Sequence, residues 1–148
     1  MKALRVSLAV VLLLTGCELL APDSEERQQF NDALAAWKRQ GVDNYSFQYE
    51  RSCECLEEWT RPALVVVRAG RVVEATDLQN GMARNTDYYL TVDALFARIR
   101  KAFDDDAHRI EIDYHPQLRY PTSVFIDQDP NVADEELTLH LSGLAKWQ

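Results

Sequence analysis

The sequence predicts an α+β fold in which two helices pack on one face of an antiparallel sheet. Two stretches carry apolar residues at helical spacing, six short stretches alternate or are rich in β-branched residues, and turn signals separate neighbouring strands. Strands joined by short turns pair antiparallel, and amphipathic helices bury their apolar side on such a sheet. The order helix, three strands, helix, three strands also suggests a tandem αβββ repeat.

The first helix is predicted over residues 24–40. Asp23 and Glu26 have the spacing of a capping box at its start, and Gly41 is a typical stop. Its apolar positions share one helical face: Phe30, Ala33, Leu34 and Trp37. A strand with one buried face follows at 45–55, where aromatic residues and cysteines alternate with polar residues.

Two further strands are predicted at 64–68 and 71–76, which are rich in valine. Only Ala69 and Gly70 separate them, and this spacing is typical of a tight hairpin. Residues 77–89 show no periodicity and are predicted to form the longest loop.

The second half repeats this order of elements. Thr91 is a suitable N-cap for a second helix, and the acidic run 104–106 ends it. The apolar stripe of that helix consists of Val92, Leu95, Phe96, Ile99 and Phe103. Three strands are then predicted at 110–114, 124–126 and 137–141.

The N-terminus has the order of a cleavable export signal. Lys2 and Arg5 precede the apolar stretch 6–14, which is too short to span a bilayer as a helix. The next residues, Leu14-Thr15-Gly16-Cys17, resemble a bacterial lipobox, in which the cysteine is lipidated and becomes the first residue after cleavage.

This resemblance implies three segments. Residues 1–16 are expected to be a lipoprotein signal peptide, and 17–23 a lipidated cysteine with a short tether. Acyl chains such as palmitate on Cys17 would anchor the chain to a membrane. Residues 24–148 are long enough to form a single domain with its own core.

Lipidation also predicts location. We expect a domain held at the periplasmic face of the cell envelope, about 20 Å or less from the membrane when the tether is extended. By analogy with Gram-negative sorting signals, Glu18 after Cys17 favours the outer membrane in a host of that kind.

The charge of the chain limits its partners. Cleavage after residue 16 removes two positive charges, so the formal charge moves from −8 to −10. Such an acidic protein is a poor candidate for nucleic acid, which is bound through lysine and arginine. The expected partners are the membrane, through the lipid, and an unidentified periplasmic protein or ligand; no cofactor is predicted.

Several segments together resemble an uncharacterised bacterial lipoprotein family, the domain of unknown function 6174. The segments that carry the resemblance are Tyr45-Ser46-Phe47-Gln48-Tyr49 with Arg51-Ser52-Cys53-Glu54-Cys55, Val73-Glu74-Ala75-Thr76-Asp77, Thr91-Val92-Asp93-Ala94-Leu95-Phe96, Tyr120-Pro121-Thr122-Ser123 and Ala133-Asp134-Glu135-Glu136. Glu54 and the pair Leu118-Arg119 depart from the pattern expected of that family. The resemblance implies a fold and a location, and no chemistry.

Cys53 and Cys55 are the most distinctive candidate site. Across two fully extended residues the Cα atoms lie roughly 6.6–7.0 Å apart, at the upper limit for a disulfide, so a bond between them needs a bulge or turn. A local structural disulfide, thiol–disulfide exchange and binding of a soft metal ion are all open alternatives. Arg51 would favour a thiolate, whereas Glu54 and its acidic neighbours oppose one.

An acidic segment near the C-terminus copies the first half of a calcium loop. Its candidate ligands are Asp127, Asp129, Asn131 and Asp134. Val132 stands where an EF-hand needs glycine, and Thr138 where it needs glutamate, so an EF-hand is excluded. An irregular calcium site and a solvated acidic loop are the alternatives.

Trp59, Tyr88 and Tyr89 are predicted to lie in loops, where aromatic residues often mark a contact surface. No serine-nucleophile motif or glycine-rich phosphate loop occurs, and the three histidines are scattered. The leading hypothesis is therefore a non-enzymatic binding or interaction domain. The alternative hypothesis is a thiol–disulfide exchange protein that uses Cys53 and Cys55.

Overall fold

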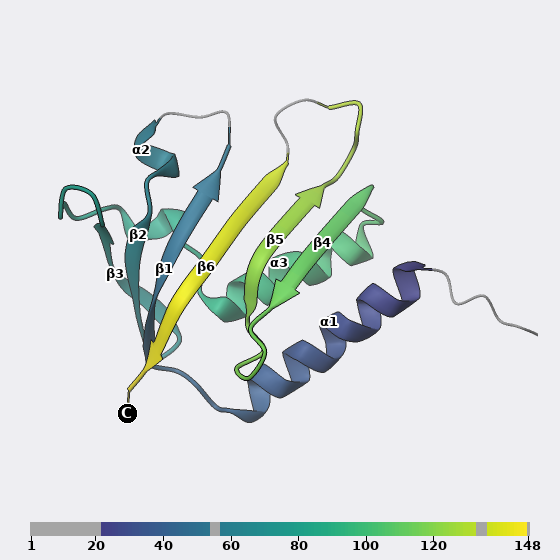
Figure 1. Ribbon diagram of the computed structural model, residues 1–148, viewed down its shortest axis with the longest axis horizontal. Helices are drawn as coiled ribbons and strands as arrows, with labels where there is room; N and C mark the ends of the chain where they lie inside the picture. Colours follow the sequence, from purple (N-terminus) through teal and green to yellow (C-terminus); the bar gives the residue numbers. More distant parts are fainter. Residues whose placement is uncertain (1–21, 54–56, 133–135, 148) are drawn as a thin grey trace, which may run out of the picture.

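The computed structural model describes residues 22–53, 57–132 and 136–147. Within them, two long helices and a short one accompany a six-stranded antiparallel sheet, which confirms the predicted α+β class (Figure 1). The elements in chain order are α1 (Pro22–Arg39), β1 (Tyr45–Ser52), α2 (Glu57–Thr60), β2 (Ala63–Arg68), β3 (Arg71–Asp77), the 3₁₀ turn η1 (Thr86–Tyr88), α3 (Val92–Asp104), β4 (Arg109–Tyr114), β5 (Pro121–Asp127) and β6 (Leu137–Lys146).

The strands are arranged in the order β3-β2-β1-β6-β5-β4. Each half of the chain forms a three-stranded meander, and the two meanders join where β1 pairs with β6. A β-bulge interrupts this central pairing, because Phe47 lies opposite both Gly143 and Leu144. Gly143 has φ +61°, a conformation that a glycine adopts without steric cost.

The two halves do not repeat in space, although the predicted order of elements is confirmed. In a tandem repeat β4, β5 and β6 would correspond to β1, β2 and β3, and each corresponding strand here runs in the opposite direction. Both long helices nevertheless lie on the same face of the sheet (Figure 1). A rotation that reverses the direction of the strands must also reverse either their order in the sheet or the face that the helices cover. Here both the order and the covered face are the same in the two halves, so no rotation superposes them.

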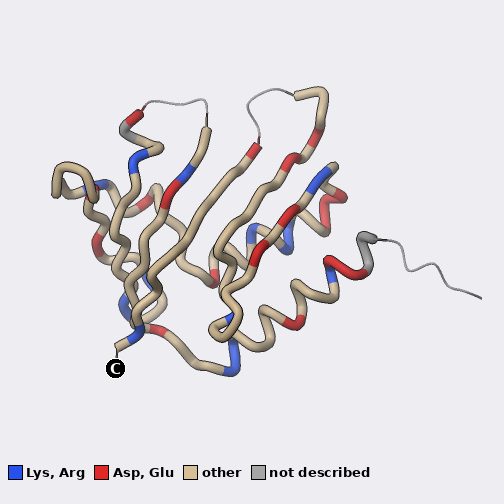
Figure 2. The backbone as a smooth tube through the Cα atoms, viewed as in Figure 1, with Lys and Arg blue, Asp and Glu red and all other residues tan. Residues whose placement is uncertain are grey.

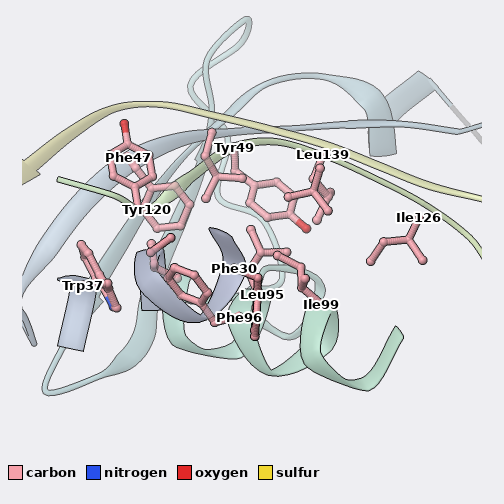
Figure 3. Close-up of a cluster of buried hydrophobic side chains, with 14 of the residues drawn as sticks. Phe30, Trp37, Phe47, Tyr49, Leu95, Phe96, Ile99, Tyr120, Ile126 and Leu139 are labelled. Atoms are coloured by element: carbon pink, nitrogen blue, oxygen red, sulfur yellow. The ribbon is translucent and has the colours of Figure 1, made fainter. Parts of the chain in front are cut away.

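The hydrophobic core lies between the sheet and the two long helices. From α1, Phe30 and Trp37 enter it, and Phe30 packs against Phe96 of α3 with ring centroids 5.9 Å apart (Figure 3). Alternate residues of the strands supply the other side, including Phe47 and Leu139, which are fully buried. The predicted apolar stripes of both helices are thus the faces that pack on the sheet.

The helix ends differ in how well they were predicted. Thr91 caps α3 as expected, since its hydroxyl accepts a hydrogen bond from the Ala94 N–H at 3.1 Å. At the start of α1 the prediction was wrong by two residues: the helix begins at Pro22, so Asp23 lies in the first turn and not before it. Proline is favoured at a first helical position, because its missing N–H would have no partner there.

The predicted hairpin between β2 and β3 forms with a two-residue loop. Both loop residues have positive φ, +48° at Ala69 and +70° at Gly70, as a type I′ turn requires. The loop is tied to the segment before β1, because the Ala69 N–H donates to Asn44 Oδ1 at 3.0 Å and the Gly70 N–H donates to the Asp43 carbonyl. These hydrogen bonds offset the steric cost of holding Ala69 in a left-handed conformation, which glycine adopts more easily.

The other face of the sheet is more exposed and polar, with Gln48, Glu74 and His140 among its residues. None of the helices in the described part of the chain is both long and apolar enough to cross a bilayer.

Tyr45 connects the central strand to the start of α3. Its buried hydroxyl accepts a hydrogen bond from the Val92 N–H at 2.9 Å. Without this bond the Val92 N–H, in the first turn of α3, would have no partner within the helix. Burial raises the pKa of Tyr45 to about 12, so this hydroxyl stays protonated at neutral pH.

Replacing Tyr45 by phenylalanine is expected to lower the free energy of unfolding by about 1–3 kcal/mol, because it leaves the Val92 N–H buried without a partner. Urea denaturation measures this loss. Tyr114→Phe is the matched control, since the Tyr114 hydroxyl has no hydrogen-bond partner among the described residues and its removal should cost nothing. Equal losses in the two variants would contradict a specific role for Tyr45.

Candidate functional site

A pocket of about 330 Å³ lies on the helical side of the sheet, at the end of β1 and the beginning of β2. Its walls come from α2, from the end of β1 and from the loop after β3. The pocket is lined by Tyr49, Arg51, Trp59, Arg61, Asp77, Asn80, Met82, Ala83, Arg84, Asn85, Tyr88 and Tyr89. The three aromatic residues predicted from the sequence as contact residues therefore meet in one place.

The floor of the pocket follows from the strand register. Tyr49 pairs with Ala63, and Ala63 pairs with Asp77, so these three residues form one row across β1, β2 and β3. All three are buried on the same face. The two outer residues of this row, Tyr49 and Asp77, line the pocket.

Asp77 is the buried carboxylate of this site. Its Oδ1 accepts hydrogen bonds from the N–H groups of Gln79 and Asn80, at 2.8 and 3.3 Å. Its Oδ2 forms ion pairs with Arg61 Nε at 3.1 Å and with Arg84 Nη2 at 2.9 Å. A single carboxylate thus holds the turn after β3 and positions two arginines from different segments.

Burial by itself would raise the pKa of the Asp77 carboxyl. The hydrogen bonds from the backbone of Gln79 and Asn80 and the charges of Arg61 and Arg84 outweigh it, so the pKa lies below its ordinary value. Asp77 is therefore ionised at neutral pH and is a poor proton acceptor.

The loop after β3 is held against the sheet by backbone contacts. Thr76 and Ala83 form an isolated antiparallel bridge, and the Arg84 N–H donates to the Ala75 carbonyl at 2.8 Å. Asn85 then caps the 3₁₀ turn by accepting a bond from the Asp87 N–H. The segment predicted as the longest loop is thus ordered by specific hydrogen bonds.

Two aromatic pairs form the walls. Trp59 and Tyr88 have ring centroids 4.4 Å apart and remain 37% and 47% exposed. Tyr49 and Tyr89 meet edge to face at 5.2 Å, deeper in the structure. The first pair presents aromatic surface to solvent at the entrance, while the second supports the base.

Arg51 lies at the end of β1, on the same face as Tyr49. Its Nη2 donates to the Tyr88 carbonyl across a long distance of 3.4 Å, and its buried Nε has no hydrogen-bond partner among the described residues. Burial raises the pKa of Tyr49, and a hydrogen bond from the Arg51 side chain, together with its charge, partly offsets this effect.

A second hollow of about 480 Å³ adjoins the first. Arg51, Trp59 and Tyr88 line both hollows. The other residues that line the second hollow are Ser52, Cys53, Asp87, Leu90, Arg98, Glu136 and Leu137.

Cys53 lies one residue beyond the end of β1, in a bend, whereas the predicted strand continued to residue 55. Its sulfur belongs to a disulfide, and its predicted partner Cys55 lies outside the described residues. The pairing of these two cysteines, thiol exchange and soft-metal binding therefore stay predictions. Cys17 also lies outside the described residues.

The calcium candidates are arranged as a turn. Asp129 Oδ1 accepts bonds from both the backbone N–H and the side-chain Nδ2 of Asn131, at 2.9 and 2.8 Å. These bonds lower the pKa of the Asp129 carboxyl. Asp134 lies outside the described residues, and no group of three possible metal ligands forms among those described. Asp127 has a buried Oδ1 in β5.

Sequence reasoning missed the charged half of the site. The sequence pattern places Asp77 at the start of the predicted loop 77–89 and gives no role to Arg61 or Arg84. One local signal was available. An aspartate at the start of a turn often accepts hydrogen bonds from the N–H groups two and three residues later, which here belong to Gln79 and Asn80. The pairing with the arginines depends on the register of β2 and β3, which this signal does not contain.

Asp77→Asn keeps the acceptor for the turn but removes the charge that two arginines share, so it is expected to destabilise the protein at neutral pH. Because the folded pKa of Asp77 lies below its ordinary value of 3.8, its contribution is present above that pH and is lost as the pH falls through the folded pKa. The difference in unfolding free energy between wild type and variant should therefore shrink on acidification.

Chemical denaturation at several pH values from about 7 down to about 2 measures this difference. Asp113→Asn, which changes an exposed carboxylate on β4, is the control. A gap for Asp77→Asn that stays constant down to the lowest pH would contradict the role assigned to this carboxylate.

The family comparison covers most of the domain. Residues 29–146 match the family described as "Family of unknown function (DUF6174)". Searches of curated proteins and of solved structures find no match. The matched range includes every strand, α3 and all residues that line the pocket. The chain therefore belongs to the DUF6174 family, whose function is unknown.

Proposed function

We propose that this chain is a membrane-anchored envelope lipoprotein whose domain binds a small ligand in the pocket beside α2. The observation that supports binding is the convergence of Trp59, Tyr88 and Tyr89 with three arginines around one hollow. The proposed anchor is lipidated Cys17, at the periplasmic face of the envelope and at the outer membrane in a Gram-negative host.

The size of the pocket favours a small molecule. Ligand sites in proteins commonly enclose about 300–1,000 Å³ and combine apolar walls with a few fixed polar groups. The volume here, about 330 Å³, lies at the lower end of this range, and its lining has the same mixture.

The chemistry of the pocket favours binding over catalysis. The buried carboxylate Asp77 is occupied by four protein donors and has a lowered pKa, so it is suited to fixing arginines and not to accepting a proton. Arginines so placed are rigid donors, which is the arrangement expected of a recognition site.

The anchor is tested by Cys17→Ser. Wild-type protein should fractionate with membranes and have an intact mass that lacks residues 1–16 and includes acyl chains. The Cys17→Ser variant should leave the membrane fraction, whereas Cys53→Ser should stay there. A wild-type protein that keeps residues 1–16 and a bare thiol would refute the anchoring proposal.

The binding site is tested by Trp59→Ala. Full-length protein is equilibrated with a small-molecule extract of its host, separated by ultrafiltration, and the retained compounds are identified by mass spectrometry. Loss of Trp59 should weaken retention of the ligand at least about tenfold, because truncating an aromatic residue that carries much of the binding energy costs about 2 kcal/mol or more.

Trp147→Ala is the matched control. Trp147 is 38% exposed, almost the same as Trp59, but it follows β6 at the other end of the sheet. Retention that falls equally in both variants, or no compound retained by the wild type, would count against a ligand site in this pocket.

A further inference from the structure

The charge of the pocket is opposite to that of the chain. The whole sequence has a formal charge of −8, yet the pocket is lined by three arginines and one aspartate. Blue and red segments are interspersed over the whole fold, and a red segment directly adjoins the blue one near the upper end of β1 (Figure 2), so the positive surplus belongs to the pocket lining and not to that end of the sheet. A local positive surplus in an acidic protein is a feature that a specific anion would exploit.

The hydrogen-bond acceptors among the pocket-lining side chains are largely used by the protein itself. Both oxygens of Asp77 are engaged by protein donors. The side-chain oxygens of Asn80 and Asn85 accept bonds from the N–H groups of Met82 and Asp87. The carboxylate and amide oxygens of the lining are thus each engaged by at least one donor of the protein.

Arg51 has the greatest capacity to bind a ligand. Arg61 and Arg84 are positioned by Asp77, whereas Arg51 has no carboxylate partner among the described residues and contacts only neutral groups, the Tyr88 carbonyl and the Tyr49 side chain. What distinguishes Arg51 from the other two arginines is therefore that Asp77 does not neutralise its charge. A carboxylate next to Arg51 could accept two parallel N–H bonds from the planar guanidinium.

Apolar surface adjoins this donor group. Trp59 and Tyr88 are partly exposed at the entrance, and Met82 is 64% exposed in the opposite loop. Aromatic faces favour a flat apolar body, and methionine adapts its shape to one.

We infer that the pocket binds a small organic carboxylate with a flat apolar body, whose acid group lies at Arg51 and whose body packs on Trp59 and Tyr88. This inference rests on the proposed binding function and adds the chemical class of the ligand.

Three probes with the same indole ring test which ligand charge the pocket prefers. Isothermal titration calorimetry of the full-length protein in detergent measures the affinity for the anionic indole-3-acetate, the neutral indole-3-ethanol and the cationic tryptamine. Indole-3-acetate should bind at least about tenfold more tightly than the other two, since a hydrogen bond between charged groups is stronger than one between neutral groups. Its affinity should also fall as ionic strength rises.

Arg51→Gln tests the position of the acid group. It should remove most of the preference for indole-3-acetate and leave the affinity for indole-3-ethanol unchanged. Arg68→Gln is the matched control, because Arg68 is exposed at the far end of β2, and it should change neither affinity. If Arg51→Gln fails to fold, the three probes on wild-type protein still decide the inference.

The outcomes separate this inference from the proposed function. Equal affinity for all three probes, reduced by Trp59→Ala, would overturn the carboxylate specificity and leave a ligand pocket in place. Tighter binding of tryptamine would do the same. Failure of all three probes to bind would also overturn the inference, whereas the retention experiment, which assumes no charge, decides the proposed function.

Discussion

The pairing of β1 with β6 is the constraint on which the rest of the structure depends. It joins Tyr45–Ser52 to Leu137–Lys146, which are almost the whole domain apart in sequence, and without it the chain would form two separate three-stranded meanders. Each meander alone would have a strand edge with unpaired backbone groups at this position. The pairing also brings the inner faces of both meanders under the same helices, so that one core forms. Such distant contacts carry a large entropic cost of loop closure, which the buried aromatic residues of β1 help to offset.

The pocket uses the same sheet in a different way. A row of residues across three strands places Tyr49 and Asp77 on the same face of the sheet, and both side chains line the hollow. Asp77 then compensates charges that would be costly on a partly buried surface, and its hydrogen bonds fix the turn that carries the opposite wall. Fold stability and the shape of the site therefore depend on the same carboxylate.

Much of the fold could be predicted from the sequence, because periodic apolar residues report directly on which face is buried. The stripe of α3, its Thr91 cap and the Ala69-Gly70 hairpin are local features, and each was predicted correctly. The strand order could not be predicted, since no local pattern distinguishes β6 from β4 as a partner of β1. Four-residue α2 was missed because one helical turn has no periodicity. In the site, the aromatic residues were proposed as a contact group, whereas the arginines become neighbours only through the register of the strands.

The two edges of the sheet, β3 and β4, lie next to different parts of the molecule. The beginning of α1 lies beside β4, where Glu25 and Glu26 share a hollow with Ile110, whereas the pocket lies across β1 to β3 (Figure 1). Five interstrand spacings of about 4.8 Å separate the two edges, a breadth of about 24 Å. In a domain tethered as proposed, the sheet would act as a spacer that keeps the mouth of the hollow clear of the lipid headgroups. A water-soluble compound could then diffuse in from the aqueous side without crossing the bilayer interface.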